Sequence, residues 1–316
     1  MRPKPDKTHP RKREMRAISY GIVVHGGAGS SQRLTGVCAA IGKKAFAMLE
    51  AGGEALDAAV EAVRLFEEDG RFNAGRGSSL RLDGRTVEMD AGVMDSSGRL
   101  GSVMAVRDVR NPILVARAVS GTPHCALAGQ GASIFAKKMG IGPSPPISQG
   151  ACKRYEKMVR LIREGGLEKK DGRWKAADLE SLWNFEVPYG LVIPPDTVGA
   201  VAKDRSGRFA VAGSTGGASP MMLGRVGDTA VVGSGFYAGP IAAIAATGIG
   251  EEIMRKTTAK AVYDLIREGK GAQEACEQGV AMFPASVSVG MIAITSSACA
   301  VAANRRMATY SLTKEI

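Results

Sequence analysis

The chain changes character between residues 139 and 197, and this change constrains its fold more than any other feature. Residues 139–195 hold prolines at 143, 145, 146, 194 and 195 and a charged stretch over 153–170. Such a composition predicts a mobile connector that contains a helix or two. An apolar strand pattern then begins abruptly at Thr197. We therefore expect one composite domain made of two segments, 17–196 with the mobile linker 139–195 and then 197–316.

Hydrophobic periodicity on both sides of the connector predicts strands and helices in turn. Strands are expected at 17–24, 103–106, 197–203, 209–213 and 230–234, with hairpins at 80–94 (turning at Asp83-Gly84) and at 286–303. Helices are expected at 34–49, at 54–66, after Asn111-Pro112, at 127–138 and over most of 240–268. The strand patterns show little alternation, which indicates burial on both faces. Sheets covered by helices on their outer faces fit this order.

The formal net charge is +11, and residues 1–16 alone hold seven Lys or Arg against two Asp or Glu. A basic arm that binds nucleic acid is one interpretation of this tail. We favour a disordered, solvated tail, because no aromatic residues interleave with the charges and no nucleic-acid-binding motif follows. The tail lacks the apolar stretch of a signal peptide, and no run of about 18 apolar residues predicts a membrane span. Neither nucleic acid nor a membrane is expected as a partner.

The cysteines are far apart in the sequence and odd in number: Cys38, Cys125, Cys152, Cys276 and Cys299. This pattern is neither a disulfide framework nor a metal cluster. Buried, reduced thiols are the expectation, which fits a cytoplasmic protein. His9 and His124 have no partners at ligand spacing, so no zinc site is predicted.

Residues 194–201, Pro-Pro-Asp-Thr-Val-Gly-Ala-Val, carry the strongest chemical signal. A threonine hydroxyl is a weak nucleophile until a base takes its proton. A chain that begins with threonine can use its own α-amine as that base, and an internal threonine reaches this state only if the chain is cut before it. The alternative is that Thr197 is a β-branched residue that simply opens a strand. Taken alone, this segment favours the alternative.

The motifs that surround Thr197 reverse that preference. They are, in chain order, His25–Gly29, Gly53–Ala58, Phe72–Gly77, Glu88–Ala91, Asn111–Ile113, Gly213–Gly217, Gly224–Asp228 and Ala246–Glu251. Any one of these glycine-rich motifs would be a weak signal, but the ordered set is specific. Over about residues 20–310 the chain resembles the plant-type asparaginase and isoaspartyl (β-aspartyl) peptidase family of N-terminal-nucleophile hydrolases.

The resemblance implies a four-layer αββα sandwich, an α+β fold in which two stacked, mostly antiparallel sheets are flanked by helices. It implies that Thr197 attacks the Asp196 carbonyl, that an N→O acyl shift gives an ester, and that water splits the chain there. The α subunit would be 17–196 and the β subunit 197–316. The processed enzyme would hydrolyse L-asparagine or β-aspartyl dipeptides, would assemble as a homodimer of αβ units, and would need no organic cofactor.

The resemblance also implies roles for residues around the nucleophile. Thr215 would hydrogen-bond near the Thr197 amine and tune it, although its hydroxyl could instead only satisfy backbone at a strand end. Thr247 and the backbone N–H of Gly248 would form an oxyanion hole, where fixed donors meet developing negative charge. Asn73 would contact the nucleophile from the other subunit of the αβ pair.

Two charged residues would bind the α-carboxylate and the α-ammonium of the substrate, which together form its headgroup. Arg225 would grip the α-carboxylate, a task that suits a planar and always charged guanidinium. Asp228 would hold the α-ammonium, and Gly250 would add a backbone contact. The alternative is that Arg225 and Asp228 form an ordinary surface ion pair.

A glycine-rich loop in the first segment resembles one that binds sodium through backbone carbonyls in this family. The matching residues are Phe66, Glu67, Asp69, Phe72, Ala74 and Arg76. The glycines could equally serve only to permit the turn. His25 lies in a motif, but a threonine amine makes a histidine base unnecessary, so a structural role is expected for it.

Three positions depart from the family pattern. Asp196 stands where most isoaspartyl members have glycine, Met221 where lysine is common, and Val289-Gly290 where a glycine pair is usual. Asp196 resembles glycosylasparaginases and taspase, so a hydrolase of that kind on the same scaffold is an alternative function. An unprocessed, inactive homologue is a second alternative. These departures bear on substrate preference and on the rate of self-cleavage more than on the reaction class.

Overall fold

The computed structural model describes residues 17–81, 83–143, 147–163, 184, 197–218 and 221–315. The tail 1–16, Asp196 and most of the connector beyond residue 163 lie outside this part of the chain, so the expectations for them stay predictions. Within the described ranges, no helix combines the length and the apolar character that crossing a bilayer requires.

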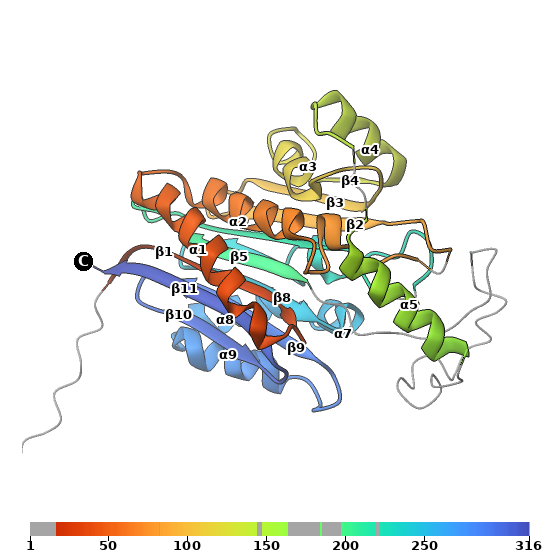
Figure 1. Cartoon of the computed structure of the whole chain (residues 1–316). Helices are drawn as coiled ribbons and strands as arrows, with labels where there is room; N and C mark the ends of the chain where they lie inside the picture. Colours follow the sequence, from red (N-terminus) through yellow and green to blue (C-terminus); the bar gives the residue numbers. More distant parts are fainter. Residues whose placement is uncertain are drawn as a thin grey trace, which may run out of the picture.

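Two β-sheets lie face to face at the centre of the molecule (Figure 1). The larger has the order β11-β1-β5-β6-β2-β3-β4 and consists of β1 (Ile18–Ala28), β2 (Met89–Asp95), β3 (Leu100–Val106), β4 (Ala126–Ala128), β5 (Val198–Lys203), β6 (Phe209–Thr215) and β11 (Met307–Glu315). The smaller has the order β10-β9-β8-β7 and consists of β7 (Phe236–Gly239), β8 (Ala242–Gly248), β9 (Val289–Thr295) and β10 (Cys299–Ala303). The ladders are antiparallel apart from β3–β4.

Helices cover the outer face of each sheet, so the domain has the four layers that were expected (Figure 1). The larger sheet carries α1 (Thr35–Glu50), α2 (Ala55–Asp69), α3 (Pro112–Val119) and α4 (Gly129–Lys138), and the smaller carries α8 (Thr258–Arg267) and α9 (Ala272–Ala281). Helix α2 buries the expected apolar positions 55, 56, 59, 60, 63 and 66, and it also buries Ala58, Ala62 and Glu67, so its buried face is broad. Three apolar cores result, one between the two sheets and one under each helical layer.

The centre of the larger sheet is formed by strands from both segments. Strand β5 pairs with β1 on one edge and with β6 on the other, and every residue of β5 and β6 is buried. The sequence Val198–Lys203 has no alternation because α2 covers one face and the smaller sheet the other. The strands expected at 197–203 and 209–213 and their burial are therefore confirmed.

The hairpin expected at 80–94 is wrong. Residues up to 88 form a loop, in which Asp83-Gly84 does turn because Gly84 N–H donates to the Arg81 carbonyl (3.0 Å). The real hairpin joins β2 to β3, with a turn closed by Gly98 N–H on the Asp95 carbonyl (3.1 Å). Asp83-Gly84 was a genuine turn signal, but the residues before and after it do not pair as strands.

The second segment needs two corrections. The strand expected at 230–234 is instead a short 3-10 turn, Asp228–Ala230, followed by an irregular turn. The helix expected over most of 240–268 begins with β8, which pairs with β9 in the smaller sheet, and only then continues as α7 (Gly250–Arg255) and α8. Strand β11 and helix α9 were not expected. Within the connector, α5 (Gln149–Arg163) is one helix of the kind predicted.

The contact of α3 with β3 gives a stability test. A Cβ on Gly101 would lie 2.1 Å from the Ala116 carbonyl oxygen and 2.6 Å from the Ser120 nitrogen, both backbone atoms of α3 and its end. We expect Gly101→Ala to lower the free energy of unfolding by about 3 kcal/mol, because helix and sheet must separate. Gly36→Ala is the matched control, because nothing lies within 4 Å of its added carbon. Equal unfolding midpoints in denaturant for the two variants would contradict this packing.

Candidate active site

Thr197 stands at the head of β5, next to the last residue of β6. In the antiparallel register Val198 faces Ser214, so the adjacent position sets Thr197 opposite Thr215. Both are buried. The Thr197 hydroxyl lies 3.3 Å from the hydroxyl of Thr229, at hydrogen-bonding distance. Thr197 directly precedes β5, so the ladders that hold β5 also restrain the backbone of Thr197.

Thr215 leads into a tight glycine turn that reaches back to the first segment. Its hydroxyl accepts a hydrogen bond from the Gly217 N–H (3.1 Å). The side chain of Asn73 donates to the Gly217 carbonyl (2.7 Å), and the Asn73 carbonyl accepts from the Gly216 N–H (2.8 Å). A Cβ on Gly216 would lie 2.6 Å from the Asn73 amide oxygen. The structure therefore places Asn73 against the turn that follows Thr215.

Thr247 and Gly248 approach the same region from the smaller sheet. They end β8, and the Thr247 hydroxyl accepts from the Ala28 N–H (3.3 Å) at the end of β1. Gly248 has φ +143°, and a Cβ there would lie 2.2 Å from the Ser288 carbonyl oxygen. Only glycine fits this close approach. The two predicted oxyanion-hole residues thus lie where the two sheets meet at the strand ends.

Arg225 and Asp228 are neighbours in the loop 224–228, but they are not a surface ion pair. Arg225 is 14% exposed and donates through Nε (2.8 Å) and Nη2 (2.6 Å) to the Glu251 carboxylate. Asp228 is buried, and its Oδ2 has no hydrogen-bond partner among the described residues. Burial raises the pKa of Asp228 to about 7, against the opposing charge of Arg225.

The guanidinium of Arg225 and the carboxyl group of Asp228 come together at Gly250. A Cβ on Gly250 would lie 2.8 Å from Asp228 Oδ1 and 2.9 Å from Arg225 Nη2. Only glycine fits here, and its lack of a side chain lets an acceptor and a donor of opposite charge approach one point. An ammonium and a carboxylate on one molecule are the groups that such a pair would bind.

Sequence reasoning missed Thr229 and gave no role to the carboxylates of Glu88 and Asp90. Thr229 directly follows Asp228, and its hydroxyl faces the nucleophile, so the end of the Gly-Arg-Val-Gly-Asp motif could have been extended by one residue. Met221, one of the departures, is buried, and its sulfur accepts from the Ala218 N–H (3.2 Å). A Cβ on Gly217 would lie 2.3 Å from its methyl carbon, so Met221 covers the glycine turn after Thr215.

The segment predicted to bind sodium begins in the last turn of α2, which contains Phe66, Glu67 and Asp69, and continues into a loop that is compact because of its glycines. A Cβ on Gly77 would lie 2.0 Å from the Phe72 carbonyl oxygen, and one on Gly75 would lie 2.7 Å from the Glu67 carbonyl oxygen. Ser148 closes the loop by donating from its hydroxyl to the Gly70 carbonyl (2.9 Å). Backbone oxygens crowd the inner side of this turn, which is the donor type that a hard cation takes. Among the described residues no group of His, Cys, Asp and Glu could hold a metal ion.

His25 lies close to the nucleophile without being placed to activate it. It is fully buried beside Gly199, where an added Cβ would lie 2.3 Å from His25 Nε2. Its Nδ1 accepts from the Gly27 N–H (3.1 Å). Burial lowers the pKa of His25 to about 3, although a hydrogen bond with the Thr197 backbone acts in the other direction. A base this weak fits the structural role that was expected for His25.

We expect His25 to remain neutral from pH 5 to pH 8, because its pKa of about 3 lies below that range. In proton NMR its ring Hε1 resonance should keep a constant chemical shift over this range. The His25→Gln variant identifies the resonance, since that signal alone should vanish. A shift with a midpoint between pH 5 and pH 8 would show that the ring is protonated and would contradict the burial argument.

Comparison with known proteins identifies the family of the chain. The family described as asparaginase matches residues 18–315. An isoaspartyl peptidase/L-asparaginase of Danio rerio is 43% identical over 271 residues, which are 82% of this chain and 80% of the relative. Plant-type L-asparaginases of Thermococcus kodakarensis and Pyrococcus furiosus are 39% and 37% identical, over 83% and 93% of this chain and 84% and 96% of their own lengths. With a match over nearly its whole length, the chain belongs to the asparaginase family.

Proposed function

We propose that this chain is an N-terminal-nucleophile hydrolase that cuts itself before Thr197 and then hydrolyses L-asparagine and β-aspartyl dipeptides. The observation that carries the proposal is the convergence of Arg225 and Asp228 at Gly250, in the loop whose next residue, Thr229, contacts the Thr197 hydroxyl. The relatives named isoaspartyl peptidase/L-asparaginase and plant-type L-asparaginase support the substrate class.

Self-cleavage comes first. The Thr197 hydroxyl oxygen attacks the Asp196 carbonyl carbon. The C–N bond between Asp196 and Thr197 then breaks, and the proton that the hydroxyl loses moves to the nitrogen. The result is an ester on Thr197 with a free α-amine. Water then hydrolyses the ester, which releases the Asp196 carboxylate and restores the hydroxyl. Thr229 supports this step because its hydroxyl lies close enough to orient the attacking oxygen.

Turnover uses the same hydroxyl with the new amine as its base. The oxygen attacks the substrate side-chain carbonyl, and Thr247 with the Gly248 N–H would stabilise the oxyanion that forms. Ammonia leaves from asparagine, or an amino acid leaves from a β-aspartyl dipeptide, and the aspartyl group remains on Thr197 as an ester. Water hydrolyses this ester and releases aspartate. Thr215 would hydrogen-bond near the amine, and its position opposite Thr197 in the strand register supports this role.

Recognition of the headgroup follows from the charges. The unpartnered Asp228 Oδ2 would accept from the substrate α-ammonium, whose charge also favours the ionised carboxylate. Arg225 would bind the α-carboxylate with two parallel hydrogen bonds, exchanging the contact that it makes with Glu251. Asparagine and β-aspartyl dipeptides share this headgroup, so one clamp serves both.

The proposal also includes a structural sodium ion, the oligomeric state and the cellular compartment. Backbone carbonyls of the 66–76 loop would hold a structural sodium ion that fixes the turn carrying Asn73. Two processed αβ units would form a homodimer, as the family resemblance implies. The free cysteines, two of them fully buried, fit a reducing compartment such as the cytoplasm.

The wild-type chain should yield fragments of 196 and 120 residues, the smaller beginning with Thr197. Thr197→Ala removes the attacking oxygen and should stay one chain without activity. Thr197→Ser is the matched control, because it keeps a hydroxyl and should still be cut. A denaturing gel with N-terminal sequencing of aged protein measures both. Cleavage of Thr197→Ala at this bond would show that another group attacks it.

Substrate isomers test the headgroup clamp. In a β-aspartyl peptide the α-carboxylate is free for Arg225, whereas in the α isomer it is consumed in the peptide bond. We expect hydrolysis of the β isomer only. Arg225→Lys loses the bidentate geometry and Asp228→Asn loses the counter-charge, so each should lower kcat/KM by about tenfold to a hundredfold.

Both of these variants should still cut themselves, because self-cleavage uses no substrate headgroup. Liberated amino acids are measured for the wild type and both variants on α and β isomers. Equal rates on the two isomers, or an Arg225→Lys variant as fast as the wild type, would refute the clamp and favour a taspase-like endopeptidase.

A further inference from the structure

Two buried carboxylates, Glu88 and Asp90, take no part in the steps above. Glu88 directly precedes β2 and Asp90 lies within it, and both are almost completely buried. A buried carboxylate is unfavourable unless hydrogen bonds or opposite charges compensate it. Part of that compensation comes from the loop 224–228. Gly224 N–H donates to Glu88 Oε2 (2.9 Å), and Gly227 N–H donates to Asp90 Oδ2 (3.2 Å).

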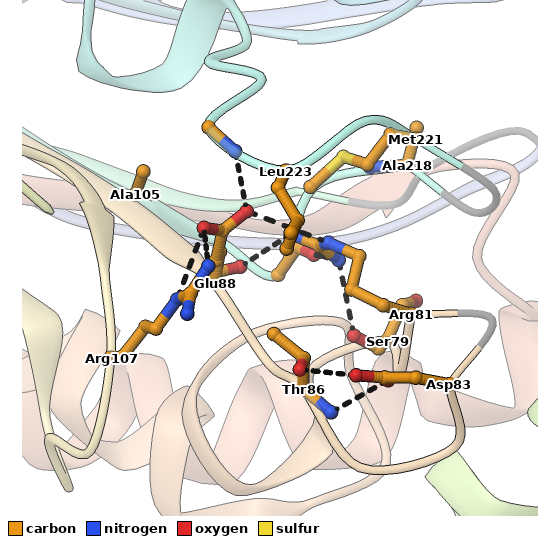
Figure 2. A network of polar contacts seen from close by, with 12 residues as sticks. Ser79, Arg81, Asp83, Thr86, Glu88, Ala105, Arg107, Ala218, Met221 and Leu223 are labelled. Carbon is orange, nitrogen blue, oxygen red and sulfur yellow. Dashed lines mark hydrogen bonds and ion pairs between the residues drawn. The ribbon is translucent and has the colours of Figure 1, made fainter. Parts of the chain in front are cut away.

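Glu88 also lies between two arginines, as Figure 2 shows. Its Oε1 accepts from Arg107 Nη2 (2.6 Å) and Nε (3.1 Å), and its Oε2 lies 3.8 Å from Arg81 Nε. Arg81 is fully buried, and burial lowers its pKa to about 10, so it is charged at neutral pH. Arg81 Nη1 donates to the Gly216 carbonyl (3.3 Å) just after Thr215. One cluster therefore contacts both the loop 224–228 and the turn behind the nucleophile.

Asp90 is aimed at that loop by a β-bulge. The β2–β3 register shifts between Met89 and Ala91, opposite Ala105, whose φ of 48° is left-handed and unfavourable for alanine. The Ala105 N–H donates to Asp90 Oδ1 (2.8 Å). Asp90 thus uses one oxygen to hold the strained bulge and the other to hold Gly227. From this strained backbone we infer that the direction of the Asp90 side chain matters for function.

We propose that Glu88 and Asp90 are positioning residues for substrate recognition. By fixing the glycine N–H groups on both sides of Arg225, they hold its guanidinium beside Asp228 at the separation that a substrate headgroup spans. They should therefore set the KM for the aspartyl headgroup, while kcat and self-cleavage at Thr197 depend on other contacts. This inference rests on the proposed function.

A pair of Glu88 variants separates positioning from charge compensation. Glu88→Asp keeps the negative charge near Arg81 but is one methylene shorter, so its oxygen withdraws from Gly224. Glu88→Gln keeps the length, so its amide oxygen can stay on Gly224 while its NH₂ faces Arg107, which is 45% exposed and can turn to solvent. Positioning predicts a larger rise in KM for Glu88→Asp. Charge compensation alone predicts the reverse order.

Asp90→Asn is the second test. Both Asp90 oxygens accept from backbone N–H groups, and asparagine has only one oxygen, so one N–H must face an NH₂ group. We expect KM for a β-aspartyl dipeptide to rise about tenfold for Glu88→Asp and for Asp90→Asn, the loss of about one hydrogen bond, with kcat within about twofold. Arg85→Gln is the control and should keep the wild-type KM, because the Arg85 side chain is 87% exposed and pairs with Asp83.

The experiment measures KM, kcat and the extent of self-cleavage for these variants and the wild type. A raised KM with normal kcat and complete self-cleavage, and the order Glu88→Asp above Glu88→Gln, would support positioning. An unchanged KM in both Glu88→Asp and Asp90→Asn would overturn it, as would loss of self-cleavage together with kcat, which indicates a merely structural role. A processed but inactive wild type would refute the proposed function itself and this inference with it.

Discussion

The place of Thr197 depends on β5 being paired along both edges and covered on both faces. The backbone of Thr197 cannot shift far without straining the ladders that β5 makes to β1 and β6 and disturbing the core between the sheets. Thr215 is fixed opposite by the same register, and Thr229 is brought to 3.3 Å by the turn that follows. Backbone hydrogen bonds therefore position the reacting group, so few side chains are needed to hold it.

The second constraint is electrostatic. Acidic and basic groups are buried together at the ends of β2 and β6, and each must find a partner in a region of low dielectric. Burial, against the opposing charge of Arg225, raises the pKa of Asp228 to about 7, so its carboxyl group is partly protonated near neutral pH. The glycines of the loop 224–228 offer backbone N–H groups to the other two carboxylates, Glu88 and Asp90. Gly224 and Gly227 thus help to hold in place the loop that carries Arg225.

The sequence was a good guide where pattern and chemistry agreed. Continuous apolar runs before and after Asp204–Gly207 predicted β5 and β6, and the helical spacing of 55–66 predicted α2. The motif residues Arg225, Asp228 and Gly250 do converge. This much follows from local periodicity and from ordered motifs. Their contacts do not, because a loop geometry such as that of 224–228 is set by residues far away in the sequence.

The failures have physical causes. Strand β8, Ala-Ala-Ile-Ala-Ala-Thr-Gly, is a short apolar run rich in alanine, and periodicity alone cannot distinguish it from a buried helix. Residues 80–88 contain the buried Arg81 and Glu88, and several partners of these side chains lie far away in the sequence, at Arg107, Gly216 and Gly224. The local pattern therefore looked like one strand of a hairpin. Thr229 gave no signal of its own. A hydroxyl that matters through one distance to another hydroxyl is visible only in three dimensions.

The strand order of the larger sheet has one more consequence. Strands β5, β6 and β11 come from after residue 197, whereas β1 lies between β11 and β5, and β2 continues the sheet beyond β6. The larger sheet therefore alternates between the two segments, whereas the core under α8 and α9 is formed by the second segment alone. A cut before Thr197 would leave two pieces joined by the β1–β5, β1–β11 and β2–β6 ladders and by the two cores that both segments share. Because the larger sheet needs strands from both segments, we expect it to assemble in the intact chain, before any cut.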